Sequence, residues 1–157
     1  MNPDAISREG AAAAMAPQRW WGPRKAALDY EISTRRCVAR TTVCVSGNPT
    51  LEQLVSALHV FGIESGAAVR ETMLIDLRRL EAVYARADLL RIGHEIACSF
   101  AHLDQLALLV QPHRVTRISE RAARRAGMNM RVFDSEQLAV SWLQLHAGAA
   151  ARARGLN

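Results

Sequence analysis

Two histidines and a cysteine recur at intervals of four residues in the second half of the chain. His94, Cys98 and His102 stand at i, i+4 and i+8, a spacing at which helical side chains can bind a metal ion from one face. The segment HEIAC resembles a zinc-protease motif in which the second histidine is changed. At about 100° per residue, however, these side chains lie away from the apolar stripe of their helix, whereas catalytic zinc requires a shielded cavity. We therefore expect surface residues here, with no metal and no cofactor.

A second group of polar residues stands where predicted strands end. The group consists of Ser46, Asn48, Asp76, Arg78, His113 and Asp134. In an open parallel sheet, the carboxyl ends of the strands converge on one rim, where a ligand or a partner can bind. Asp76 can pair with Arg78, however, and Asp134 can cap a helix. Because no nucleophile beside a base and no glycine-rich phosphate loop accompanies them, these residues predict local structural roles rather than catalysis.

Five arginines follow within twelve positions. They are Arg114, Arg117, Arg121, Arg124 and Arg125. On a continuous helix they would fall within an arc of about 100°. Such a stripe could bind a polyanion such as nucleic acid, acidic lipid or acidic protein, or it could be a solvated face whose stems shield apolar neighbours. No aromatic residue interleaves with the arginines, so the pattern favours the solvated face and disfavours nucleic acid.

The composition limits the class of protein. With 157 residues, half of them hydrophobic, the chain has the size of one domain with a single core. A net charge of +5 permits contact with polyanions without demonstrating it. No apolar run approaches the ~20 residues that cross a bilayer, and we expect no membrane span. Three cysteines without a close-spaced metal motif are typical of reduced thiols in the cytoplasm.

Hydrophobic periodicity predicts the elements that position these residues. The runs YEISTRR and VARTTVCVS predict an antiparallel N-terminal hairpin, and Thr50 with Gln53 forms a capping box before the next helix. The short apolar runs TMLIDL, QLALLV and NMRVF then alternate with amphipathic helices. The order β-β-α-β-α-β-α-β-α predicts an α/β fold with a mostly parallel sheet of four to five strands.

The two ends of the chain carry no such periodicity. We expect residues 1–28 to be a disordered extension, or one loosely docked through the pair Trp20 and Trp21. Residues 29–146 are expected to form the α/β domain, and 147–157 a disordered tail.

Three segments give the chain a resemblance to a known family. They are SGNPTLEQL after the hairpin, LIDLRRLE in the middle and MRVFDSEQLAVSWL at the end. In this order of elements they resemble the STAS superfamily, which includes the anti-sigma factor antagonists and the SpoIIAA-like proteins. The resemblance covers about residues 29–146. It implies a STAS-like fold and a bacterial, cytoplasmic protein that acts in regulation.

The resemblance also identifies a residue that this chain lacks. Many anti-sigma factor antagonists carry a serine or threonine at the start of the helix after the central strand, where a kinase phosphorylates it. This chain has the sequence ARAD at positions 85–88, and neither residue type occurs between Met73 and Cys98. Alanine cannot accept a phosphoryl group, so the phosphorylation switch is absent unless Tyr84 replaces the missing acceptor. Asp88 could supply a fixed negative charge near the helix N-terminus instead.

These observations predict a non-catalytic regulatory module that interacts with a protein partner, and a homodimer is compatible with this prediction. The alternative is a domain that binds a small apolar ligand or a lipid, because STAS-like proteins resemble lipid-transfer domains of the Sec14 type. A lesser alternative is polyanion binding through the arginine stripe. We expect no enzymatic activity.

Overall fold

The computed structural model describes residues 29–37, 40–66 and 72–153. The predicted extension 1–28, with Trp20 and Trp21, lies outside the described residues, as do the last four residues of the predicted tail. The elements are β1 (Tyr30–Cys37), β2 (Arg40–Gly47), α1 (Leu51–Gly66), β3 (Thr72–Leu80), α2 (Arg86–Ser99), β4 (Leu106–Leu109), η1 (Pro112–Arg114), α3 (Ile118–Arg125), β5 (Met130–Phe133) and α4 (Glu136–Ala153).

The described residues form one five-stranded sheet in the order β1-β2-β3-β4-β5. The hairpin β1–β2 is antiparallel, and β2, β3, β4 and β5 run parallel to one another. The register places Met73, Leu106 and Met130 side by side on three neighbouring strands. The predicted α/β class, the N-terminal hairpin and the order of elements are confirmed.

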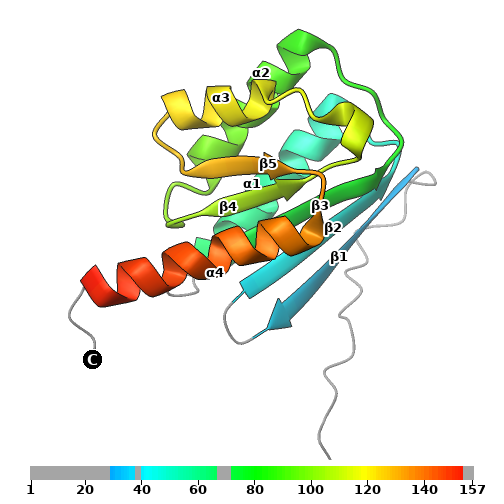
Figure 1. Ribbon diagram of the computed structural model, residues 1–157. Helices are drawn as coiled ribbons and strands as arrows, with labels where there is room; N and C mark the ends of the chain where they lie inside the picture. Colours follow the sequence, from blue (N-terminus) through cyan, green and yellow to red (C-terminus); the bar gives the residue numbers. More distant parts are fainter. Residues whose placement is uncertain (1–28, 38–39, 67–71, 154–157) are drawn as a thin grey trace, which may run out of the picture.

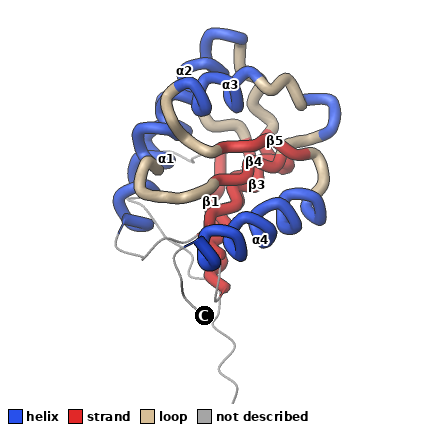
Figure 2. The backbone as a smooth tube through the Cα atoms, turned by 60° about the vertical axis from the view of Figure 1, so that its left-hand side comes forward, coloured by secondary structure: helices blue, strands red, loops and turns tan. Residues whose placement is uncertain are grey.

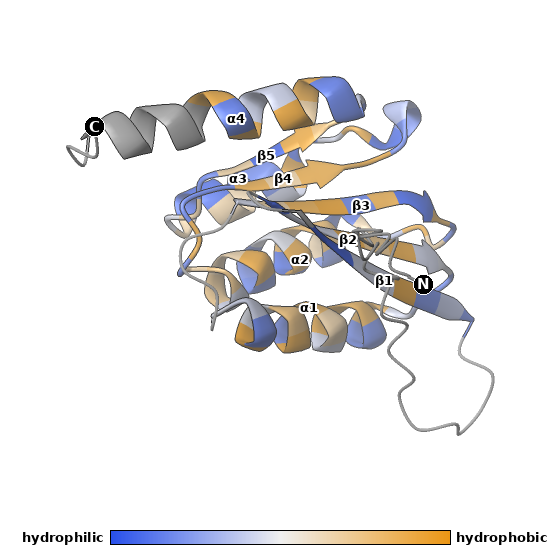
Figure 3. Ribbon diagram, turned by 90° about the horizontal axis from the view of Figure 1, so that it is seen from below, coloured by the Kyte–Doolittle hydropathy of each residue, from blue (hydrophilic) through white to orange (hydrophobic). Residues whose placement is uncertain are grey.

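The connectivity determines which face each helix covers. Each new parallel strand is added on the same side of the sheet, so right-handed crossovers place α1, α2 and α3 on one face. The last helix, α4, does not connect to a further strand of the sheet, and it lies across the opposite face of β3, β4 and β5 (Figures 1, 2 and 3). The sheet is therefore the middle layer of three.

Each face of the sheet has its own core. The larger core lies under α1, α2 and α3 and includes the fully buried Phe100. The smaller core lies under α4 and consists of Leu74, Ala107, Leu109, Ala139 and Leu143. Alternate residues of β3 and β4 supply the two cores, as the pleat of a strand requires. No helix among the described residues is long and apolar enough to cross a membrane.

The start of α1 agrees with the predicted capping box, whereas the start of α4 differs from the prediction. The Thr50 backbone N–H donates to Gln53 Oε1 at 2.9 Å, and the Gln53 N–H donates to Thr50 Oγ1 at 3.3 Å. At α4, Ser135 rather than Asp134 caps the helix, because its carbonyl accepts the Ala139 N–H at 3.0 Å. The prediction that Asp134 caps this helix is therefore wrong, and in the observed register Leu138 is 58% exposed.

The C-terminal end of α4 also differs from the prediction. Helical backbone continues to Ala153, although we expected a disordered tail from residue 147. The segment AGAAARA is rich in alanine, which has the highest helix propensity, and this composition lets α4 extend without an apolar stripe.

Candidate functional site

A charged network lies at the carboxyl end of β3, facing α4. The Arg78 guanidinium donates to Asp76 Oδ2 at 2.7 Å and to Glu136 Oε2 at 2.8 Å. The Gln111 side chain donates to the Arg78 carbonyl at 2.6 Å. The predicted pair of Asp76 with Arg78 is therefore present. Its links to Glu136 and Gln111, which join β3 to α4 and to the end of β4, could not be recognised from local spacing.

The two groups of the pair stabilise each other's charged forms. Partial burial of the Asp76 carboxyl raises its pKa, but hydrogen bonds from the Arg78 side chain and backbone outweigh this effect. The net result is a pKa of Asp76 below its ordinary value. The pKa of Arg78 is raised, chiefly by its hydrogen bond to Asp76.

We expect the Asp76–Arg78 pair to make the free energy of unfolding depend on pH in the acid range. Because the folded-state pKa of Asp76 is depressed, its contribution is present above the ordinary value of 3.8 and is lost as pH falls through the lower folded value. Asp76→Asn should therefore be less stable than the parent chain at pH 7, and the difference should shrink towards pH ~2. Urea unfolding at both pH values measures it. Asp134→Asn, at an exposed carboxyl, is the control, and an undiminished difference at low pH would contradict the assignment.

The other predicted rim residues have separate positions. Ser46 Oγ donates to the Glu31 carbonyl at 3.4 Å within the hairpin. Asn48 is exposed in the β2–α1 loop, and His113 is exposed in η1. Within the described ranges, no hydrogen bond or ion pair joins these three side chains to Asp76 or Arg78. The predicted rim residues thus lie at the same end of the sheet, but their side chains do not form one cluster.

The half-buried Cys44 thiol lies next to Asp76, on the neighbouring strand β2. Strand register places Cys44 opposite Asp76 on β2 and β3. Burial raises the pKa of the thiol, and the Asp76 carboxylate raises it further, so the thiol is protonated at neutral pH. A protonated thiol is a poor nucleophile.

The β3–α2 loop is held from two sides. From one side, the Arg114 guanidinium donates to the carbonyls of Leu80 and Ala82, both at 2.8 Å, and to that of Glu81 at 3.2 Å. From the other side, the Tyr84 hydroxyl donates to the Pro49 carbonyl at 2.9 Å. Burial, with a smaller effect of the Asp88 charge, raises the pKa of Tyr84 to about 12. Both anchors keep the loop in one conformation.

The same loop leads into α2 at the segment ARAD, positions 85–88. Ala85 is the N-cap residue, and its backbone N–H donates to the Asp88 carboxylate at 3.1 Å. A carboxylate at this position also offsets the positive end of the helix dipole. The negative charge predicted near the N-terminus of α2 is therefore in place, bonded to the helix's own backbone.

The five arginines do not form the continuous stripe that we expected. α3 begins at Ile118, and Arg117 before it has a left-handed backbone with φ of 56°, which ends any helix from the preceding residues. Arg114 lies in η1, where it binds the backbone carbonyls described above. Arg121 and Arg125 are exposed on α3. The prediction of a single helical face was wrong. Arg117 has a strained backbone conformation, which residue spacing cannot reveal, and it separates Arg114 from the other arginines.

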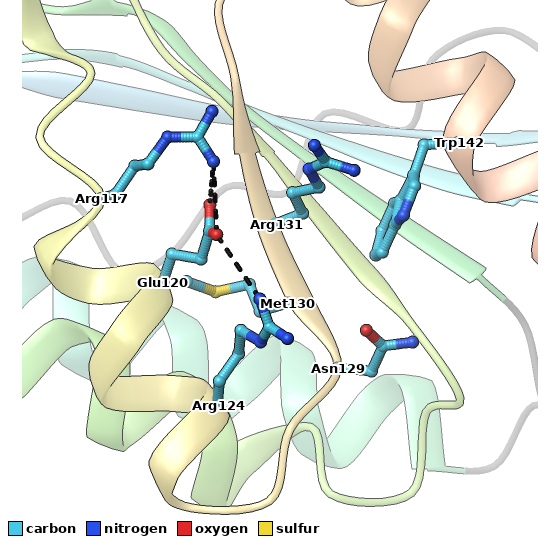
Figure 4. A pocket seen from close by; sticks show the side chains of 7 residues that line it. All are labelled: Arg117, Glu120, Arg124, Asn129, Met130, Arg131 and Trp142. Carbon is cyan, nitrogen blue, oxygen red and sulfur yellow. Dashed lines mark hydrogen bonds and ion pairs between the residues drawn. The ribbon is translucent and has the colours of Figure 1, made fainter.

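Two of these arginines line a cavity of about 330 Å³ at the edge strand β5, between α3 and α4 (Figure 4). Its polar lining comprises Arg117, Glu120, Arg124, Asn129, Arg131 and Trp142. The buried Glu120 carboxylate accepts the Val132 N–H at 2.9 Å and lies 3.4 Å from Arg117 and 4.0 Å from Arg124. The sequence placed Arg117 and Arg124 in one arginine stripe, but it gave no sign that Arg131 and Trp142 join them.

The three residues with metal-like spacing do not meet at one point. His94 Nε2 and Cys98 Sγ are 3.7 Å apart on the exposed face of α2. His102 lies beyond the end of that helix and is hydrogen-bonded to Ser65 Oγ of α1 at 2.9 Å. In the described part of the chain, no three histidine, cysteine or acidic side chains are grouped so as to hold a metal ion.

Comparisons with known proteins identify the fold. A protein of the DUF3478 family from Shewanella loihica PV-4, described as uncharacterised and SpoIIAA-like in fold, matches with a TM-score of 0.50 and 17% identity, covering 78% of this chain and 99% of the other. An anti-sigma factor antagonist from Mycobacterium paratuberculosis matches with a TM-score of 0.54 and 14% identity, covering 77% of this chain and 99% of the other. No family model and no curated protein matches the sequence. The chain has a SpoIIAA-like fold, as the resemblance of its segments implied.

Proposed function

We propose that this chain is a non-catalytic regulatory module that binds a protein partner through the β3–α2 loop and the first turn of α2. The observation that carries the proposal is Val83, which is 84% exposed at the centre of this loop. Val83 is the most exposed of the large apolar side chains among the described residues, and it stands in a loop that neighbouring elements hold in place, where binding residues are often found. The likeness in fold to an anti-sigma factor antagonist supports a regulatory role.

The rigidity of the loop supports the same proposal. Arg114 and Tyr84 hold the loop backbone on both sides of Val83. A surface that is ordered before binding loses less conformational entropy when a partner docks. The loop therefore presents Val83 as a preformed anchor.

The proposed module works without a phosphorylation switch. Ala85 has no hydroxyl, and the N–H at the start of α2 is already bonded to Asp88. Unlike a phosphoryl group, the Asp88 carboxylate is not added or removed by another enzyme, so binding would be constitutive. Regulation would then come from the amount of protein or from the partner.

The proposal is tested by substituting Val83 and comparing with an equally exposed apolar residue elsewhere. A photo-crosslinking residue at position 83, introduced in the native host, captures the partner for identification. With that partner purified, Val83→Glu should weaken binding at least tenfold, the scale of an interface hot spot. Ile63→Glu, at a residue 80% exposed on α1, should leave the affinity unchanged.

Three results would overturn the proposal. The first is the absence of any crosslinked protein at position 83. The second is an equal loss of affinity in Val83→Glu and Ile63→Glu, which would indicate non-specific adhesion. The third is turnover of a substrate by the purified chain that Asp76→Asn abolishes, because a catalytic carboxylate at the rim would replace the binding role.

The alternatives differ in how the structure bears on them. A homodimer would appear as a second species in sedimentation at micromolar concentration, and Val83→Glu would separate it if the same loop were used. An apolar ligand or lipid remains a prediction. The cavity at β5 does not favour it, because guanidinium and carboxylate groups line that space.

A further inference from the structure

The cavity beside β5 lies apart from the β3–α2 loop and needs its own explanation. We propose that it binds a small organic anion. A phosphate or carboxylate group of this ligand would meet the guanidinium groups of Arg117, Arg124 and Arg131, and a flat apolar part would lie against Trp142. The volume of about 330 Å³ is at the lower end of the range for small-molecule sites, roughly 300–1,000 Å³.

The charges of the lining are unequal. Three guanidinium groups face one carboxylate, that of Glu120. Each guanidinium has several N–H donors, whereas a carboxylate accepts about four hydrogen bonds, and the Val132 N–H already uses one of those on Glu120. The Arg117 and Arg124 contacts with Glu120 are long, at 3.4 and 4.0 Å. The lining therefore has donors and positive charge to offer to an incoming oxyanion.

The backbone of β5 favours a small molecule over an added peptide strand. The carbonyls of Asn129 and Phe133 accept hydrogen bonds from the N–H groups of Leu106 and Val110, so the N–H groups of Met130 and Val132 point away from the sheet. Met130 N–H donates to the Met128 carbonyl at 2.9 Å, and Val132 N–H donates to Glu120. A peptide pairing with this edge would have to displace both bonds. A ligand held by side chains displaces neither.

The backbone at Arg117 is consistent with a binding role for its side chain. Among the described residues, Arg117 is the only one other than glycine with a positive φ. This conformation is strained for an L-residue, and such strain is concentrated at functional sites. In Figure 4 the Arg117 side chain extends from the start of α3 towards Glu120, on one side of the cavity.

The opposite side of the cavity is aromatic. Trp142 of α4 packs against Phe133, with ring centroids 5.6 Å apart, and the Arg131 guanidinium lies 5.5 Å from the centroid of the Phe133 ring. A flat ligand ring can stack on such a surface while its charged group faces the arginines. The two parts of the lining therefore select an aromatic anion over a bare ion.

The test uses calorimetric titration of the full chain with phenyl phosphate, benzoate, inorganic phosphate and benzyl alcohol. Phenyl phosphate and benzoate distinguish the two oxyanions, inorganic phosphate tests the need for the ring, and benzyl alcohol tests the need for charge. Trp142 is one of three tryptophans, so its fluorescence in a Trp20→Phe, Trp21→Phe chain reports the location of the bound ring. We expect saturable binding of at least one aromatic anion, accompanied by a change in Trp142 fluorescence.

Substitutions separate this site from general positive charge. Arg117→Gly removes a guanidinium and at the same time relieves the strained φ, so it should weaken binding about tenfold or more without lowering stability. Arg131→Ala should weaken binding by a similar factor. Arg121→Ala, on the exposed part of α3 outside the cavity, should leave binding unchanged.

Any of three outcomes would overturn the inference. One is no saturable binding of either aromatic anion at millimolar concentration in low salt. Another is an equal effect of Arg121→Ala and Arg117→Gly, which would assign binding to diffuse surface charge. The third is binding of inorganic phosphate as tight as that of phenyl phosphate, with no response from Trp142, which would remove the aromatic part of the site.

Discussion

Gly93→Ala should lower the free energy of unfolding by about 2–3 kcal/mol, although alanine is the better helix former. The reason is that α2 and α3 approach each other at Gly93. An added Cβ would lie 2.8 Å from Ser119 Cα and 2.9 Å from Ala122 Cβ, and it would collide with the Ser119 carbonyl oxygen. Because two of these three neighbours are backbone atoms, the helices would have to separate.

A matched glycine provides the control for this prediction. Gly66 ends α1, and an added Cβ there meets no atom within 4 Å. Gly66→Ala should change stability by no more than about 0.5 kcal/mol. Urea unfolding followed by circular dichroism measures both variants, and the midpoint for Gly93→Ala should fall while the slope stays the same. An unchanged midpoint would mean that α2 and α3 are not in close contact at Gly93.

What the sequence predicted about the fold came from local patterns. The stripe that includes Ile92, Gly93 and Ile96 marked the buried face of α2, because an amphipathic helix repeats its apolar positions about every 3.6 residues. Thr50 and Gln53 marked the start of α1, because both partners of a capping box lie within four residues. Interactions between residues this close in sequence can be recognised from the sequence pattern.

The parts that could not be predicted depend on long-range contacts or on backbone strain. Arg78 meets Glu136, 58 positions later, and no spacing rule connects them. Arg117 adopts a left-handed φ, although arginine has no local preference for it, so the stripe was extended to Arg114 in error. The place of Trp142 in one cavity with Glu120 and Arg124 depends on how α3 and α4 flank β5, which no local pattern records.

The role of Glu120 at the candidate anion site likewise could not be predicted from the sequence. Its substitution is the second change that we expect to lower the free energy of unfolding substantially. Glu120 is buried, and its carboxylate accepts a hydrogen bond from the Val132 N–H of the edge strand. Glu120→Ala should destabilise the domain by about 2–3 kcal/mol, because the Val132 N–H loses its acceptor at a position with little access to water. Glu120→Gln keeps an acceptor oxygen and should cost about 1 kcal/mol or less.

The difference between these two variants tests whether the hydrogen bond or the charge matters. Amide hydrogen exchange at Val132 should be fast in Glu120→Ala and protected in Glu120→Gln, because only the second retains the bond. Glu136→Ala serves as the control, since an exposed carboxylate paired with Arg78 contributes at most about 1 kcal/mol. Equal destabilisation by alanine and glutamine would assign the effect to the ion pairs with Arg117 and Arg124. In that case Glu120 would hold the arginines in place rather than close the edge of the sheet.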